Sequence, residues 1–151
     1  MSAWYNKTMA FPGELNISYY KGDTYEFKIY PKKTDGTVFD LSAFILLYDD
    51  DSNSSTPQVA YDTSKFVFST SRGASGVANQ RACYSKISDD KTHIVCAIRP
   101  ADGLTMTAGT QYVYDVQVST NTSANGYPVV HTILNGIITV TDQVATGSGT
   151  P

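Results

Sequence analysis

The chain has 151 residues, of which 41% are hydrophobic and 17% are charged, and its formal net charge is -3. This length favours a single domain. A folded chain of this size buries roughly 70% of the surface that its extended form exposes, which is enough for a core without metal or disulfide cross-links. The sequence has no lysine or arginine cluster beyond Lys32 and Lys33, which argues against a nucleic-acid partner. No apolar run approaches the roughly 20 residues of a membrane-spanning helix, so we expect no membrane partner.

The residue composition favours strands over helices. The chain contains 11 tyrosines and is rich in Thr, Ser, Val and Ile, which suit a pleated, half-buried surface. Apolar and polar residues alternate over 15–20 and over 25–30, on either side of a Lys-Gly-Asp turn. The pattern predicts two half-buried antiparallel strands joined by that turn.

The run 44–48 (FILLY) is apolar at every position, and we expect a strand at the centre of a sheet, covered on both faces. The segments 49–57 and 69–76 are polar and rich in turn residues, and are predicted to be exposed loops. Residues 100–109 are mixed and predict at most one turn of helix. Six further segments have the patterns of strands: 59–61, 65–68, 82–87, 93–99, 112–118 and 129–140, the last with a break at Gly136.

The two cysteines lie on the predicted hairpin formed by 82–87 and 93–99. With a two-residue turn at Asp89-Asp90, Cys83 would lie directly opposite Cys96, and a disulfide would be geometrically feasible. A register shifted by two residues separates the two cysteines. Buried free cysteines are common small hydrophobes, so we favour reduced thiols.

The residues that could carry chemistry form no catalytic pattern. The two histidines, His93 and His131, have no neighbouring Ser or Cys in an arrangement that nucleophilic enzymes use, and are predicted as surface residues of strands. Asp49, Asp51 and Asn53 match the opening of a calcium loop, but Ser54 and Ala60 replace its essential Gly and Glu. We therefore expect a non-enzymatic protein with no cofactor and no metal.

Aromatic residues mark the N-terminal arm, residues 1–13, which precedes the predicted domain 14–142. The arm contains Trp4, Tyr5 and Phe11, and large amphipathic rings suit contact surfaces. It is expected either to fold back over an open sheet edge or to reach a neighbouring subunit, which makes these three residues candidates for partner binding. The last residues, 143–151 (QVATGSGTP), are predicted to form a flexible tail.

The first residues lack the basic segment and apolar stretch of a signal peptide, so we expect a mature cytosolic start.

The strands are spaced roughly 10 to 15 residues apart with turns between them, which predicts an all-β sandwich rather than alternating βαβ units.

The segment Met106 to Tyr112 (MTAGTQY), followed by VYDVQV, resembles the corner between strands E and F of immunoglobulin-like and fibronectin-like sandwiches. In that corner a hydrophobic residue and a glycine turn precede a tyrosine whose hydroxyl bonds to a backbone group upstream. The resemblance implies that Tyr112 is the corner tyrosine, Met106 the apolar residue beneath it and Gly109 the turn. The implied fold is an immunoglobulin-like antiparallel β-sandwich of about seven to nine strands.

A second resemblance covers most of residues 15–142. The stretches ISYYKGDTYEFKIYPKKTDGTVFDLSAFILLY, IRPADGLTMTAGTQYVYDVQV and ILNGIITVTDQV resemble small β-sandwich domains of tailed bacteriophages. That family includes virion structural proteins and the attachment domains of upper baseplate proteins. This chain differs by its longer middle, 49–81, and by carrying no receptor-binding domain after the sandwich, which favours an accessory role over direct adsorption.

The resemblance implies a non-enzymatic virion protein, made in the host cytoplasm, that docks on other capsid or tail subunits in many copies per particle. It would serve as a capsid decoration protein or as a tail, neck, baseplate or fibre adaptor. The alternative is a carbohydrate-binding module for host-surface glycans, in which exposed Tyr and Trp rings stack on sugars and loop Asp or Asn side chains bond to hydroxyls.

Overall fold

The computed structural model describes residues 2–7, 12–49, 58–73, 80–120 and 126–144. Strands are the main regular structure of these residues, which also form one 3-10 turn, η1 (Ser42–Phe44), and one helical turn, α2 (Pro100–Gly103). The strands are β1 (Ser2–Lys7), β2 (Gly13–Glu14), β3 (Ile17–Tyr20), β4 (Tyr25–Pro31), β5 (Ile45–Asp49), β6 (Gln58–Asp62), β7 (Lys65–Ser69), β8 (Arg81–Ile87), β9 (Ile94–Ile98), β10 (Gln111–Ser119) and β11 (Val130–Thr141). The six further segments predicted as strands, and the single turn of helix, are confirmed.

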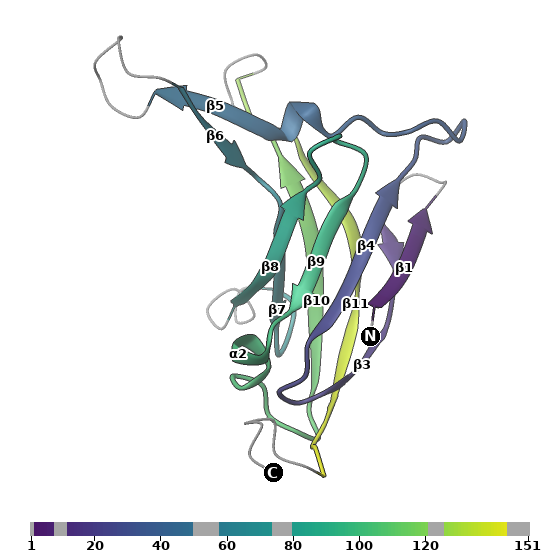
Figure 1. Cartoon of the computed structure of the whole chain (residues 1–151), viewed down its shortest axis with the longest axis vertical. Helices are drawn as coiled ribbons and strands as arrows, with labels where there is room; N and C mark the ends of the chain where they lie inside the picture. Colours follow the sequence, from purple (N-terminus) through teal and green to yellow (C-terminus); the bar gives the residue numbers. More distant parts are fainter. Residues whose placement is uncertain (1, 8–11, 50–57, 74–79, 121–125, 145–151) are drawn as a thin grey trace.

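The strands form two layers that face each other (Figure 1). One layer has the order β1-β4-β9-β8, and the other has the order β7-β10-β11, with β2 and β3 both paired to β11. Strand β8 belongs to both layers, because residues 81–83 pair with β7 and residues 84–87 pair with β9. The fold is therefore an all-β sandwich, as the sequence predicted.

The neighbour relations match those of immunoglobulin-like sandwiches. Strands β4, β9 and β8 follow the order B-E-D of one sheet in that fold, and β7, β10 and β11 follow the order C-F-G of the other. The expected antiparallel pairing holds for these six strands but not for the first three. Strand β1 is parallel to β4, and both β2 and β3 are parallel to β11.

The core lies between the layers and is built from alternate residues of each strand. Ile17 and Tyr19 of β3 and Phe27 and Ile29 of β4 are all buried, so the predicted apolar faces of these strands are confirmed. At its centre, Phe66 meets Phe27 and Tyr114 edge-on, with ring centroids 5.4 Å apart in both pairs. Burial of apolar surface, to which these rings contribute, is the main driving force for folding.

The predicted pairing of the first two strands is wrong. Strands β3 and β4 lie in different layers, where β3 pairs with β11 and β4 pairs with β1 and β9. The Lys-Gly-Asp turn carries the chain from one layer to the other, with Gly22 at a φ of +92°. The alternation indicates which face of a strand is buried, but it does not identify the neighbouring strand.

The strand predicted at 44–48 is present as β5, but its predicted place at the centre of a sheet is wrong. Phe44 ends η1 and packs into the core, whereas β5, which follows it, pairs within the described residues only with β6, in a separate two-stranded sheet. The apolar run therefore crosses from the core to an exposed element, and Leu47 is 62% exposed.

Gly136 does not break β11, which is continuous from Val130 to Thr141. Instead, a Cβ at this position would overlap the carbonyl oxygen of Leu15. The glycine allows the segment before β3 to approach the sheet closely, which is the other common reason for a glycine within a strand.

Candidate functional site

The corner between β9 and β10 is a rigid structural element. The Thr107 N–H donates a hydrogen bond to the Tyr112 hydroxyl at 2.8 Å, which is the upstream backbone contact that a tyrosine corner requires. Met106 is 1% exposed and lies in the core. Gly109 has a φ of +83°, and its N–H donates to the carbonyl of Val140 at 2.8 Å. These residues stabilise the fold.

The cysteines are free thiols, and both are buried. Cys96 lies opposite Ser85, and Cys83 pairs with Phe66 of β7, so the register that would place the two cysteines opposite each other is wrong. The Ser88 N–H donates a hydrogen bond to the carbonyl of His93. Strands β8 and β9 are therefore joined by the longer loop 89–92 and not by the predicted two-residue turn at Asp89-Asp90. Burial raises the pKa of both thiols, so they remain protonated and unreactive at neutral pH.

Both histidines pack against aromatic rings. His93 stacks on Tyr30 with ring centroids 4.7 Å apart, and its Nδ1 lies 3.8 Å from an Asp90 carboxylate oxygen. His131 meets Phe39 and Phe44 edge-on. The part of the chain that the structure describes contains no cluster of three metal-ligating side chains. Asp51 and Asn53 of the calcium-loop pattern lie outside that part.

The N-terminal arm contributes a strand to the sandwich. Within β1, Trp4 pairs in register with Lys28 of β4, and Tyr5 pairs with Ile29. Residues 2–7 of the arm thus lie along a sheet edge of their own chain, which is the first of the two predicted alternatives. Phe11 lies outside the described residues.

The first candidate surface is the β5–β6 hairpin, which stands away from the two layers at one end of the molecule (Figure 1). In its register, Leu46 lies opposite Tyr61 and Leu47 lies opposite Ala60. Leu47 and Tyr61 are 62% and 51% exposed. A two-stranded sheet is marginally stable in water by itself, and it gains most from a partner that covers its apolar side chains.

Hydrogen bonds at the base of the β5–β6 hairpin fix its direction. The Asp62 carboxylate accepts from the N–H of Ile87 at 2.7 Å and from the N–H of Ser64 at 2.8 Å. Thr63 donates to the carbonyl of Phe44 from its N–H and, at 2.7 Å, from its hydroxyl. The same hydroxyl accepts from the N–H of Ser119 at 3.1 Å. The hairpin is thus anchored to β8, η1 and β10.

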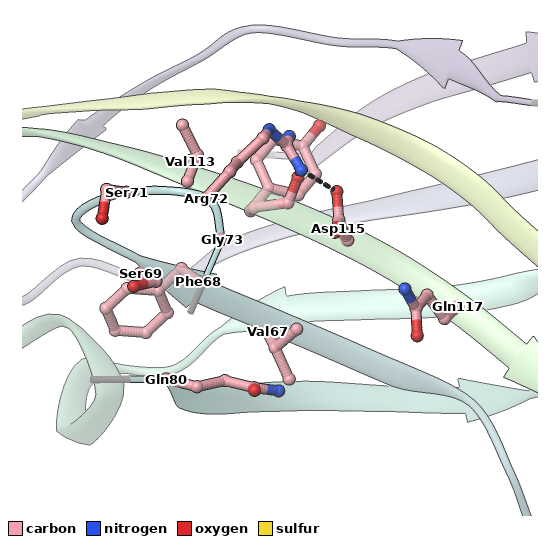
Figure 2. A pocket seen from close by; sticks show the side chains of 11 residues that line it. Val67, Phe68, Ser69, Ser71, Arg72, Gly73, Gln80, Val113, Asp115 and Gln117 are labelled. Atoms are coloured by element: carbon pink, nitrogen blue, oxygen red, sulfur yellow. Dashed lines mark hydrogen bonds and ion pairs between the residues drawn. The ribbon is translucent and has the colours of Figure 1, made fainter. Parts of the chain in front are cut away.

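The second candidate surface is a groove of about 260 Å³ on the outer face of β7 and β10 (Figure 2). Its polar lining consists of Ser69, Ser71, Arg72, Gln80, Asp115 and Gln117. The Arg72 guanidinium bonds to the Asp115 carboxylate at 2.7 Å and to the carbonyl of Tyr114 at 3.2 Å. We call this surface the β7–β10 groove.

Sequence reasoning did not find either surface. The apolar run 44–48 resembles a core strand until the structure shows that β5 lies outside both layers. Arg72 belongs to the segment 69–76, which the sequence indicates only as a polar loop. Its partner Asp115 is 43 positions away in the chain, and no local pattern connects the two.

Within the described residues, no helix has the length and apolar character needed to cross a membrane. A scan against protein-family models and a search of curated proteins each found no match to this chain.

Proposed function

We propose that the chain is a non-enzymatic structural component of a tailed bacteriophage particle, an accessory module that docks on capsid or tail subunits. The likeness of three long stretches to phage β-sandwich domains supports this proposal. The observation that carries it is the β5–β6 hairpin, which is firmly anchored at its base and exposes Leu47 and Tyr61. A rigid element with exposed apolar side chains suits contact with another protein better than it suits catalysis.

The physical basis of docking is burial of these side chains. Tyrosine is among the residues that most often dominate binding energy at interfaces, and a pre-oriented hairpin loses little conformational entropy when it binds. A particle presents many identical sites, so a modest affinity at each site is sufficient where several contacts act together. The expected partners are capsid, tail, neck, baseplate or fibre subunits.

Mass spectrometry of purified particles, separated into heads and tails, tests the proposal directly. We expect the chain in one of the two fractions at a fixed ratio to a major structural protein. Its recovery only in the soluble fraction of the lysate, with none in particles, would contradict a virion role.

The docking surface is tested with the Leu47→Ser/Tyr61→Ser double variant, which removes the exposed apolar side chain from each of the two opposite faces of the hairpin. Loss of the contact on the face that docks should reduce incorporation into particles about fivefold or more, because an interface anchor of this kind contributes upwards of about 1 kcal/mol. The matched control is Tyr20→Ser, which removes a similarly exposed tyrosine from β3. Equal incorporation of the double variant and the wild type would show that the hairpin is not the docking surface.

A deletion of residues 1–13 tests the arm separately. Because β1 pairs with β4, this deletion also opens a sheet edge, so folding of the deletion variant is checked by circular dichroism. A folded deletion variant that still enters particles would exclude the arm as the docking surface.

A further inference from the structure

We propose that the β7–β10 groove binds a neutral saccharide through hydrogen bonds to its hydroxyl groups. This binding function goes beyond docking, and it stands whether or not the chain is part of a particle. Its lining combines two amides, a carboxylate, a guanidinium and two serine hydroxyls around one groove (Figure 2). Planar amide, carboxylate and guanidinium groups can each engage two neighbouring hydroxyls at once.

The charge of the groove favours a neutral ligand. Arg72 and Asp115 carry the only formal charges among the described residues that line the groove, and they are ion-paired at 2.7 Å. Because the carboxylate neutralises the guanidinium, an anionic ligand would have to compete with Asp115 for Arg72. A hydroxyl-rich neutral ligand can instead donate to Asp115 and accept from Arg72 without separating the pair.

The pairing of the strands argues against a peptide that adds as a further strand. Strand β7 is already paired with β8 on one side and with β10 on the other, and β10 is paired with β7 and β11. Neither strand therefore offers a free backbone edge in the groove, which strand addition requires. Recognition here must act through side chains.

The volume and the apolar lining of the groove indicate how large a saccharide it can bind. A volume of about 260 Å³ lies just below the roughly 300 to 1,000 Å³ of typical ligand pockets, which suits one or two sugar rings or the end of a longer chain. Val67 and Val113 also line it and offer C–H surface to the apolar face of a ring. The exposed tyrosines among the described residues, Tyr20, Tyr61, Tyr84 and Tyr127, do not line it, so this recognition differs from the ring stacking that the sequence suggests.

The test is an NMR titration of the full chain with glucose, galactose, mannose and N-acetylglucosamine, with galacturonate and inorganic phosphate as anionic probes. We expect at least one neutral sugar to shift the amide signals of 67–71 and 113–117 with millimolar affinity, and the anionic probes to leave them unchanged. No shift with any neutral sugar, or shifts that map to other residues, would overturn the proposal.

A matched pair of variants on β10 tests the role of the amide. Gln117 lies in the groove, whereas Gln111 lies on the same strand outside it, and the side-chain amide of each donates to a threonine of β11. Gln117→Ala should weaken sugar binding about tenfold, and Gln111→Ala should leave it unchanged. Equal effects of the two variants would place the binding site elsewhere.

The Asp115→Asn variant tests the charge argument. It keeps the shape of the side chain but leaves Arg72 without its counter-charge, so galacturonate should now bind more tightly than galactose. Asp89→Asn removes a carboxylate charge in the same way, but in the exposed β8–β9 loop, and should not alter the preference for galactose over galacturonate. If Asp115→Asn still rejects galacturonate while remaining folded, ion pairing does not set the specificity, and the proposal of a charge-neutral site fails.

Discussion

The hydroxyl of Tyr114 donates a hydrogen bond to the carbonyl of Leu15 at 2.6 Å, which joins residues 99 positions apart in the chain. Tyr114 lies in the core on β10, and Leu15 precedes β3 at the edge of the same layer. The N–H of Leu15 in turn donates to the carbonyl of Asn135 at 2.9 Å. This contact holds the N-terminal segment over β11, where Gly136 leaves room for it.

The Tyr114→Phe variant should lower the free energy of unfolding by about 1 kcal/mol, because it removes one hydrogen bond at a partly buried carbonyl while keeping the ring in the core. Urea unfolding monitored by fluorescence measures the change. Tyr127→Phe, at an exposed tyrosine, serves as the control and should have no effect. Equal stabilities of Tyr114→Phe and the wild type would mean that the bond to Leu15 contributes nothing.

The Gly136→Ala variant should lower the free energy of unfolding by about 1 to 3 kcal/mol. The added methyl group overlaps the backbone oxygen of Leu15, so the segment before β3 must move away from the sheet. Thr139→Ala, at an exposed position of the same strand, should change stability by less than about 0.5 kcal/mol. Thermal unfolding compares the two, and a Gly136→Ala protein as stable as Thr139→Ala would contradict the close approach.

The Asp62→Ala variant should loosen the base of the β5–β6 hairpin. It removes the carboxylate that accepts from the N–H groups of Ile87 and Ser64, so hydrogen exchange at these two amides should accelerate about tenfold or more. Asp89→Ala, in the exposed loop after β8, should leave both amides protected. Unchanged protection in Asp62→Ala would show that the hairpin is held by other contacts.

The thiols of Cys83 and Cys96 should resist alkylation in the native protein, because both are buried and burial raises the pKa of each. Iodoacetamide should modify neither cysteine before unfolding and both after unfolding in urea. Intact mass without and with a reductant should be the same. Rapid labelling of the folded chain, or a mass increase on reduction, would contradict free buried thiols.

Stability should decline at alkaline pH. Burial raises the pKa of both thiols above the ordinary value of 9.0, so the fold favours their neutral form. Burial also raises the pKa of Tyr19 from 10.0 to about 12. Such groups contribute stability that is fully present below their ordinary pKa and is lost as pH rises through the folded value.

Each buried thiol should reduce the free energy of unfolding by up to about 1.4 kcal/mol per pH unit above about pH 9. Urea unfolding at about pH 8 and about pH 10.5 measures this loss. A Cys83→Ala/Cys96→Ala variant should lose less stability over the same interval. An equal loss in both proteins would exclude the thiols as its cause.

Local sequence patterns predicted the buried faces and the corner well. Alternation places Phe27 and Ile29 in the core, and the resemblance of Met106 to Tyr112 to the corner of immunoglobulin-like sandwiches indicated which hydroxyl bonds to the backbone upstream. These features depend on residues within a few positions of one another, so a short window of sequence contains the information that determines them.

Neither candidate surface could be predicted in this way. The β7–β10 groove depends on Arg72 reaching Asp115, and the exposed hairpin depends on β5 leaving the core directly after Phe44. Both depend on how distant segments are placed, and hydrophobicity alone does not distinguish a central strand from an exposed apolar hairpin.

The sequence by itself determined an all-β sandwich, the inward faces of its strands and the tyrosine corner, because side-chain alternation and turn chemistry are local. Only the tertiary structure decided that β3 pairs with β11, that Cys83 and Cys96 are not opposite each other and that β5 and β6 stand apart. The physical reason is that backbone hydrogen bonds between strands are nearly the same for every pair of residues. The choice of neighbour and register therefore depends on how all the side chains pack together in the core.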